Sequence, residues 1–358
     1  MNVSHRSWLR AALAVLLCAL TVCGGAVYLL DPCLYYRLPE RAVYFDERLQ
    51  NPGIIRNCPA ETVLLGTSMA ANYHKSQIEE LWGGTALRIT VPGAYLSELD
   101  ETVDLLFREQ SPGRVLLALD MNTLTRDETD LTGSLPEYLY DTDPFNDARY
   151  LLSKDSLYYC GYALLERRQG SALTVDDGFT WTYGVWWNHQ EAIREYTRPE
   201  MAEEPLPADA YDAVARANLA VIERWLTDHP ETEFHIFFSP YSILYWDRCQ
   251  RRGETEAVLS VLEQACTALL SHENVTLYAP LLDREIVDDL DHYCDYVHHS
   301  LAVCGTVLEK LRAGEDRITP SNQAQILSDW RDFVVHYDYE KLWDIHYWEA
   351  WSAAHGVG

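Results

Sequence analysis

The hydrophobic pattern divides the chain into an apolar N-terminal run and a much longer part in which apolar and polar positions alternate. Residues 11–30 contain no charged side chain. At about 1.5 Å per residue, a helix of this length spans about 30 Å, the thickness of the hydrocarbon core of a bilayer. Arg6 and Arg10 precede the run, and positive charge keeps the preceding end in the cytoplasm. We therefore expect a cytoplasmic N-terminus (1–10), a transmembrane anchor (11–30) and a main domain outside the cell membrane.

A cleaved signal peptide is the alternative interpretation of this run. It requires a shorter apolar core and a site with small residues at the cleavage point. The segment Cys23-Gly24-Gly25-Ala26 is a poor match to such a site, so an uncleaved, single-pass anchor is the favoured prediction.

Residues 31–60 are rich in Pro and Tyr, and we expect them to form a stalk and entry segment. Beyond them, strand-like apolar runs alternate with helix-like stripes. The predicted strands are 62–65, 86–91, 115–119, 233–238 and 275–277, and the predicted helices are 76–82, 97–109, 208–227, 254–270 and 301–312. Strands separated by helices form a parallel sheet with helices on both faces. Residues 61–320 are therefore predicted to be an α/β domain, a three-layer α/β/α sandwich.

Two aromatic-rich segments are not required by this alternation. The first is an insertion at about 125–207 that includes Trp181, Trp186 and Trp187. It either packs a small core of its own or forms an aromatic wall that binds substrate, because aromatic faces suit amphipathic ligands such as sugars. The second is a C-terminal tail, 321–358, which we expect to pack back on the domain; a strip that binds a partner is the alternative.

The composition is that of a folded protein, with 48% hydrophobic and 23% charged residues. A net charge of −27 argues against nucleic acid as a partner, and it also argues against contact with anionic lipid headgroups outside the anchor. Nine cysteines are present, and an exported chain permits disulfides. A bridge from Cys294 would stiffen its loop, but connectivity cannot be read from the spacing. The sequence implies no cofactor.

Two short motifs far apart in the chain carry candidate chemistry. Ser68 follows the first predicted strand in the segment Leu65-Gly66-Thr67-Ser68, and Asp295 and His298 form an Asp-x-x-His. A serine hydroxyl is a weak nucleophile until a base takes its proton, and the base needs a third group to orient it. We therefore expect Ser68 as nucleophile, His298 as base and Asp295 as the orienting group.

The same residues also have alternative interpretations. A serine after a strand can simply satisfy backbone groups in a turn, and the neighbouring His299 competes with His298 for the role of base. Residues 291–299 are also dense in metal-ligand types. A catalytic metal would leave the serine motif unexplained, so no metal site is predicted.

With these motifs the chain resembles the SGNH/GDSL hydrolases over about residues 45–320. It is most similar to their membrane-anchored branch, which includes the D-alanyl transfer proteins of teichoic acid synthesis and the acetylation proteins of bacterial exopolysaccharides. The resemblance implies the three-layer fold and the Ser68, His298 and Asp295 roles. It also implies Gly93, in Val91-Pro92-Gly93-Ala94, as an oxyanion donor.

The usual Gly-x-Asn-Asp third block of that family is replaced by Ala118-Leu119-Asp120-Met121-Asn122. Asn122 and the nearby Asn72 are therefore the remaining candidates for oxyanion donors.

These observations predict an extracytoplasmic, serine-dependent acyl-ester hydrolase or O-acyltransferase that acts on a cell-surface glycopolymer. A multi-pass membrane acyltransferase is the expected partner if the reaction is acyl transfer. The alternative is a non-catalytic surface protein that keeps the fold and binds a glycan or an assembly partner.

Overall fold

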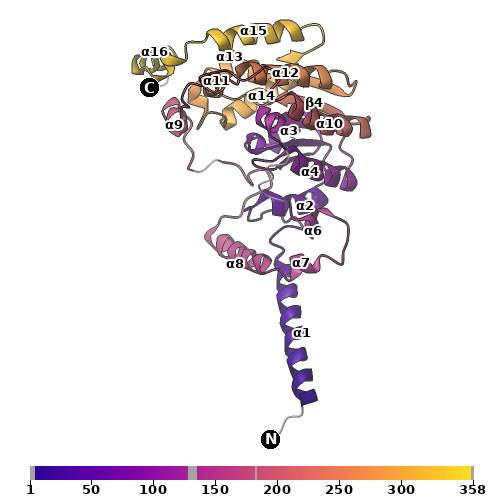
Figure 1. The fold of residues 1–358 in the computed structure, drawn as a ribbon. Coiled ribbons are helices and arrows are strands. Elements are labelled where there is room, and N and C mark those ends of the chain that lie inside the picture. The colour runs from indigo at the N-terminus through magenta and orange to yellow at the C-terminus, as the bar shows by residue number, and fades with distance from the viewer. Residues whose placement is uncertain (1–4, 128–134, 182–183, 356–358) are drawn as a thin grey trace.

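The computed structural model describes residues 5–127, 135–181 and 184–355. A six-stranded sheet lies at the centre of the domain (Figure 1), in the order β2-β1-β3-β4-β5-β6. The strands are β1 (Thr62–Gly66), β2 (Ala86–Thr90), β3 (Arg114–Leu119), β4 (Glu233–Phe238), β5 (Val275–Tyr278) and β6 (Arg317–Ile318). The predicted mixed α/β fold is confirmed.

The first five strands pair in parallel, and β6 pairs antiparallel to β5. The parallel strands are nearly continuous apolar runs because helices cover both faces of the sheet. The antiparallel edge strand was not predicted, since two residues are too few to show a strand pattern in the sequence.

Successive residues of each strand point to opposite faces, and this alternation separates the two outer layers. Val63 and Leu65 belong to the larger core, and Leu64 belongs to the smaller one. The helices packed in the larger core include α2 (Glu47–Asn57), α4 (Leu96–Glu109), α10 (Asp212–Asp228) and α12 (Thr255–Leu269). Those in the smaller core include α3 (Lys75–Trp82) and α14 (Leu301–Ala313).

The remaining helices connect or extend these layers. They are α5 (Met121–Thr125), α6 (Glu137–Tyr140), α7 (Ala148–Leu151), α8 (Lys154–Gln169), α9 (His189–Glu195), α11 (Ile243–Arg251), α13 (Arg284–Val287), α15 (Gln323–His336) and α16 (Ile345–His355), with 3₁₀ turns η1 (Ser68–Ala70), η2 (Pro280–Leu282), η3 (Leu290–His292) and η4 (Tyr339–Trp343). Within the C-terminal tail, Trp330 is buried with its ring centroid 5.7 Å from that of Trp246 on α11.

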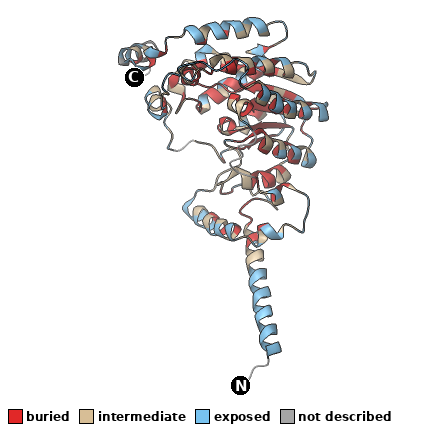
Figure 2. Cartoon of the chain, viewed as in Figure 1, coloured by how far each residue is buried: buried red, intermediate tan, exposed pale blue. Residues whose placement is uncertain are grey.

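Helix α1 (His5–Leu30) projects from one end of the domain (Figure 1) and is exposed along most of its length (Figure 2). Among the described residues it is the one helix long and apolar enough to cross a membrane. A signal sequence near the N-terminus can also meet these criteria of length and apolar composition.

Residues 31–60, the predicted stalk and entry segment, connect α1 to the sheet domain. The Asp31 carboxylate accepts hydrogen bonds from the backbone N–H groups of Tyr35, Tyr36 and Arg37, at 2.8–3.0 Å, and from the Tyr150 hydroxyl at 2.9 Å. Farther along, Ile54 and Ile55 of α2 are buried in the main core. This segment is therefore held by hydrogen bonds and apolar packing along its length.

We expect Gly53→Ala to destabilise this connection. A Cβ at Gly53 would clash with the backbone carbonyl of Leu34 and lie 2.7 Å from the backbone nitrogen of Tyr35. Because backbone must move to make room, the free energy of unfolding should fall by about 1–3 kcal/mol, which thermal unfolding will detect. Gly161→Ala in α8 is the matched control, since its Cβ meets nothing within 4 Å. Equal stability of both variants would contradict the prediction.

Candidate active site

Ser68 begins the 3₁₀ turn that directly follows β1. The strand ends at Gly66, where a Cβ would lie 2.8 Å from the Ala70 Cβ and 3.0 Å from the Ala118 Cβ. Glycine is therefore needed for the turn to fold back against β3. This places Ser68 at the carboxyl edge of the parallel strands, the edge at which ligands bind in open α/β sheets.

The loop between η3 and α14 carries Asp295 and His298. Asp295 Oδ1 accepts hydrogen bonds from the backbone N–H groups of Val297, at 2.8 Å, and His298, at 2.7 Å. Its other oxygen, Oδ2, lies 2.6 Å from His298 Nδ1. One carboxylate thus fixes both the loop and the orientation of the imidazole.

The structure brings Ser68 and His298 together, although 230 positions separate them: Ser68 Oγ lies 3.0 Å from His298 Nε2. Burial raises the pKa of Asp295, but its hydrogen bonds to His298 and to the loop N–H groups outweigh burial, and the pKa is lowered overall. An ionised Asp295 accepts the Nδ1 proton of His298, which leaves Nε2 free to accept a proton from the serine hydroxyl.

His299, the competing base, lies in the core. It is 2% exposed, and its Nδ1 is 3.5 Å from the Cys304 sulfur. Burial lowers the pKa of His299 to about 4, so its ring is neutral at ordinary pH. The structure thus assigns the neighbouring histidines to different environments, with His298 beside the serine.

The structure also shows the surroundings of the cysteines and of the potential metal ligands near residue 295. All nine cysteines are free thiols, so the disulfide considered for Cys294 is absent. In the described part of the chain, no three His, Cys, Asp or Glu side chains group as metal ligands would. Asp291 instead pairs with His189, its carboxylate 2.7 Å from the ring Nδ1.

A cavity of about 170 Å³ opens beside the serine. It is lined by Thr67, Ser68, Met69, Gly93, Ala94, Asp120, Asn122, Thr123, Arg126, Tyr241, Tyr296, Val297 and His298. Two of the three predicted oxyanion donors, Gly93 and Asn122, are in this lining. Gly93 has a positive φ of 64° and open space where a Cβ would lie, a backbone conformation that favours glycine.

Asn72, the third predicted donor, is outside the lining of this cavity. Its Oδ1 accepts the backbone N–H of Trp181 at 2.8 Å, and its Nδ2 lies 3.5 Å from the carbonyl oxygen of His299. The side chain thus ties the insertion to the loop that carries His298, and its amide is already engaged.

The three predicted substrate-binding tryptophans occupy different surroundings. The centroid of the Trp181 ring is 4.4 Å from that of the His298 ring, with the planes at 57°. Trp186 is 70% exposed and Trp187 is half-buried. None of the three tryptophans lines the cavity at Ser68, and the contact of Trp181 with the site is the one with the His298 ring.

Asp120 is a site residue that the sequence analysis did not select. It follows β3 directly, is 3% exposed, and accepts a hydrogen bond from the Thr67 hydroxyl. Burial raises the pKa of Asp120 to about 6. Its position after a predicted strand could have identified it as a site residue. Strands β1 and β3 are neighbours in a parallel sheet, so the residues that follow them meet at one edge.

A second cavity, of about 380 Å³, adjoins the first and shares Asn122, Arg126 and Tyr296 with it. Arg248 and Arg252 also line it, and both pair with the buried Glu254, at 3.6 Å and 2.9 Å. Three guanidinium groups thus face one carboxylate in this lining.

Arg126 is the third of these guanidinium groups. It donates to the carbonyl oxygen of Gly93 at 3.0 Å and lies 3.8 Å over the Tyr95 ring. The positive charge beside the site was not predicted, because Arg126 and Arg248 are far apart in a strongly acidic sequence.

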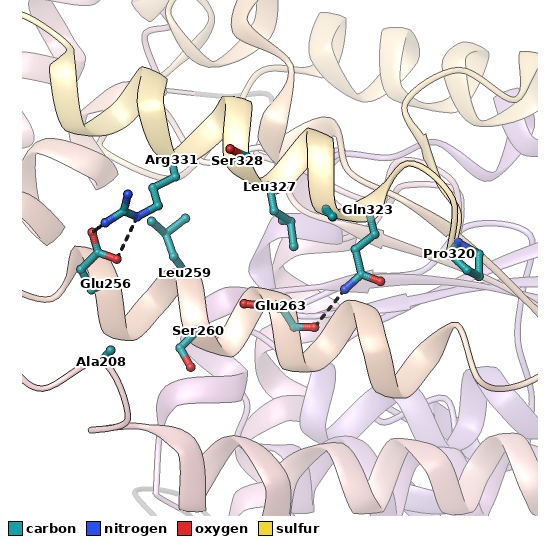
Figure 3. Close-up of a pocket in the computed structure, with 11 residues that line it drawn as sticks. Ala208, Glu256, Leu259, Ser260, Glu263, Pro320, Gln323, Leu327, Ser328 and Arg331 are labelled. Carbon is teal, nitrogen blue, oxygen red and sulfur yellow. Dashed lines mark hydrogen bonds and ion pairs between the residues drawn. The ribbon is translucent and has the colours of Figure 1, made fainter.

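A larger cavity, of about 520 Å³, lies between α12 and α15 (Figure 3). An ion pair between Arg331 and Glu256, at 2.8 Å, crosses it. It shares no lining residue with the cavity at Ser68, so cavity size and candidate chemistry do not coincide in this protein.

Comparison with known proteins gives little further information. No protein-family model matches the chain, and no curated protein matches it. Among solved structures, one match is that of "a putative platelet activating factor from Streptococcus pneumonia", with a TM-score of 0.41 and 12% sequence identity over 75% of this chain and 90% of that chain. At this TM-score the likeness carries no argument about this chain.

We expect Asp120 to make stability depend on pH. The pKa of Asp120 in the folded protein, about 6, lies above the ordinary aspartate pKa of 3.8. The contribution of Asp120 to stability is therefore fully present below the lower pKa and is lost as pH rises through the higher one. The loss is up to about 3 kcal/mol. Asn cannot ionise, so the free energy of unfolding of Asp120→Asn relative to wild type should increase between pH 4 and pH 7. Urea unfolding followed by tryptophan fluorescence measures it, and a difference that is constant with pH would contradict the assignment.

Proposed function

We propose that this protein is a membrane-anchored, extracytoplasmic acyl-ester hydrolase or O-acyltransferase with Ser68 as its nucleophile. One observation carries the proposal: an unbroken line of contacts runs from Asp295 through His298 to the Ser68 hydroxyl, which lines an open cavity. Nucleophile, base and orienting group in hydrogen-bond reach are the arrangement that serine acyl transfer requires.

In the proposed reaction, His298 Nε2 takes the hydroxyl proton while Ser68 Oγ bonds to the carbonyl carbon of an ester. The tetrahedral intermediate then expels the alcohol, which receives the proton from His298. Water or a sugar hydroxyl next attacks the acyl-serine, with His298 again as base, and Ser68 regains its proton from the imidazolium. Asp295 stabilises that imidazolium in both halves.

Negative charge on the intermediate requires preorganised donors. The backbone N–H groups of Ser68 and Gly93 and the side-chain amide of Asn122 are the proposed set, since all three residues line the cavity. Asn72 is left out because its side chain braces Trp181 and His299.

The surroundings favour a glycopolymer that carries anionic groups. Arg126, Arg248 and Arg252 offer positive charge next to the nucleophile, and guanidinium groups bind carboxylates and phosphates in a bidentate manner. Trp181 beside His298 offers an aromatic face for a sugar ring. A multi-pass acyltransferase would supply the acyl group if the reaction is transfer.

We further propose that α1 is retained as a single membrane span with the main domain outside. Trp8 and Tyr28 are both exposed near the ends of α1. They are separated by about 30 Å along a helix, so both can lie at the two interfaces where aromatic residues concentrate.

A non-catalytic surface protein that binds a glycan is the competing function. The contact between Asn72 Nδ2 and the carbonyl oxygen of His299 favours it to the extent that it removes one of the predicted oxyanion donors. The experiment on the serine separates the two functions.

We expect Ser68→Ala to abolish covalent labelling by a fluorophosphonate probe, because the probe requires an activated hydroxyl. His298→Ala should reduce labelling nearly as far, and Asp295→Asn by about 100-fold or more through misorientation of the ring. Losses in double variants should be strongly non-additive, since all three residues serve one step.

His299→Gln is the matched control and should keep labelling within a few-fold, because His299 lies in the core and away from the cavity. Thermal unfolding of each variant excludes loss of structure as the cause. A wild-type protein that is folded but is neither labelled nor active on any ester would favour the binding function.

Arg126→Gln should raise KM for an ester bearing a carboxylate or phosphate by about 10-fold, the effect of one charge-assisted hydrogen bond. A neutral ester of the same acyl group should be little affected. Arg216→Gln on α10 is the control, because Arg216 is a mostly exposed arginine outside both cavities. Equal losses in kcat on both esters would show that Arg126 acts through Gly93 and not through substrate charge.

A further inference from the structure

Helices α7 and α8 lie beside the domain-proximal end of α1 (Figure 1). A Cβ placed on Gly24 of α1 would lie 3.4 Å from Leu152 Cδ2 and 3.8 Å from the carbonyl oxygen of Leu151. Gly24 precedes Tyr28 by one turn, which is about 6 Å along the helix axis. The end of α7 therefore reaches the level of the apolar part of α1.

Aromatic packing fixes the rotation of α8 about its own axis. The ring centroid of Tyr159 is 4.2 Å from that of Phe45, in a stacked arrangement, and that of Tyr162 is 6.1 Å from it, edge-on. Residues two positions apart on a helix point about 200° apart. Leu164, two positions after Tyr162, therefore points away from Phe45, which lies two residues before α2. In Figure 1, α8 lies below α2 and to the left of the upper end of α1.

The face of α8 turned away from the domain is apolar and exposed. Leu164 is 52% exposed, Leu165 is 54% exposed and Tyr158 is 68% exposed. Ten large apolar side chains outside α1 are exposed in the described part of the chain, and five lie within 145–165; these five are Phe145, Leu152, Tyr158, Leu164 and Leu165. Apolar side chains gathered in this way mark an interaction surface.

The local charge of this surface is opposite to that of the whole chain. Helices α7 and α8 contain Arg149, Lys154, Arg167 and Arg168 against Asp155 and Glu166, a net charge of 4 − 2 = +2, whereas the chain carries −27. Arg168 follows Leu164 by four residues and Leu165 by three, so it shares their face. Long cationic side chains can lie along an apolar surface while their charged ends reach water or lipid headgroups.

We propose that α7 and α8 lie on the outer leaflet of the bilayer that α1 spans, with Leu152, Leu164 and Leu165 in the interface and Arg167 and Arg168 at the headgroups. The inference rests on the proposed retention of α1 as a membrane span. Continuity with α1 selects a lipid surface as the occupant, because Leu152 packs against α1 at a level that the bilayer must surround. The net charge of the chain argued against headgroup contact, but that sum hides the basic local composition of these two helices.

The experiment uses the full chain in nanodiscs of phosphatidylcholine and phosphatidylglycerol that contain a diazirine-bearing phosphatidylcholine. After irradiation, mass spectrometry identifies the peptides that carry lipid adducts. We expect adducts on α1 and on residues 145–168. The exposed helix α15, which lies at the other end of the domain (Figure 1), should remain unlabelled.

Two sets of variants test separately how the leucines and the arginines of α8 contribute to its contact with lipid. Leu164→Glu with Leu165→Glu should reduce adducts on 145–168 several-fold and leave adducts on α1 unchanged. Val335→Glu on α15 is the matched control, because Val335 is also an exposed apolar residue on a helix. Arg167→Gln with Arg168→Gln should remove the gain in α8 labelling that phosphatidylglycerol produces over phosphatidylcholine alone.

The outcomes separate this inference from the proposal on which it rests. Adducts on α1 without adducts on 145–168 would overturn the inference and leave the anchor intact. A chain that lacks α1 after export, or an α1 without adducts, would overturn the anchor itself. Nanodiscs that hold two copies with 145–168 shielded from lipid would assign the surface to a second copy of this chain, which also overturns the inference.

Discussion

The hydrogen bonds that Asp295 accepts hold together the geometry of the candidate site. One oxygen accepts two backbone N–H groups of its own loop, and the other meets the His298 ring. These contacts set both the position and the tautomer of the imidazole, so the short contact between His298 and Ser68 follows from them. Without this carboxylate, the loop and the ring would lose their common support, and the serine would face an imidazole of uncertain orientation.

The parallel sheet fixes the position of Ser68, as Asp295 fixes that of His298. Because β1 and β3 run side by side in the same direction, Ser68 and Asp120 follow them at the same edge. Gly66 allows the first turn to fold back closely. Thr67 then ties the two strand ends together through its hydroxyl. The nucleophile thus stands on a rigid edge, and the imidazole is carried to it by a loop that is fixed independently.

The hydrophobic pattern predicted the strand–helix alternation, because each element is marked by its own local sequence. The two short motifs predicted that Ser68, Asp295 and His298 act together. Features that depend on distant partners were not accessible. Asn72 seemed available as a donor, but its Nδ2 lies 3.5 Å from the carbonyl oxygen of His299, 227 positions away, and its Oδ1 accepts the backbone N–H of Trp181. Arg126 and Arg248 converge on one cavity although no spacing relates them. Strand β6 is defined by its pairing with β5 and has no pattern of its own.

The distribution of charge on the folded protein also depends on residues that are distant in the sequence. The net charge of the whole chain is −27. In the structure, however, arginines lie beside Ser68, and a basic helix that carries leucines lies beside α1. Salt screens exposed charges over about 10 Å, so a ligand responds to its immediate surroundings more than to the total. The Tyr150 hydroxyl donates a hydrogen bond to the Asp31 carboxylate where α1, α7 and the domain meet. Under the proposed topology, the domain would then contact the bilayer at two points, α1 and α8. Two fixed contacts restrict its tilt where one flexible linker would not, so the candidate site would keep a constant orientation to the membrane surface.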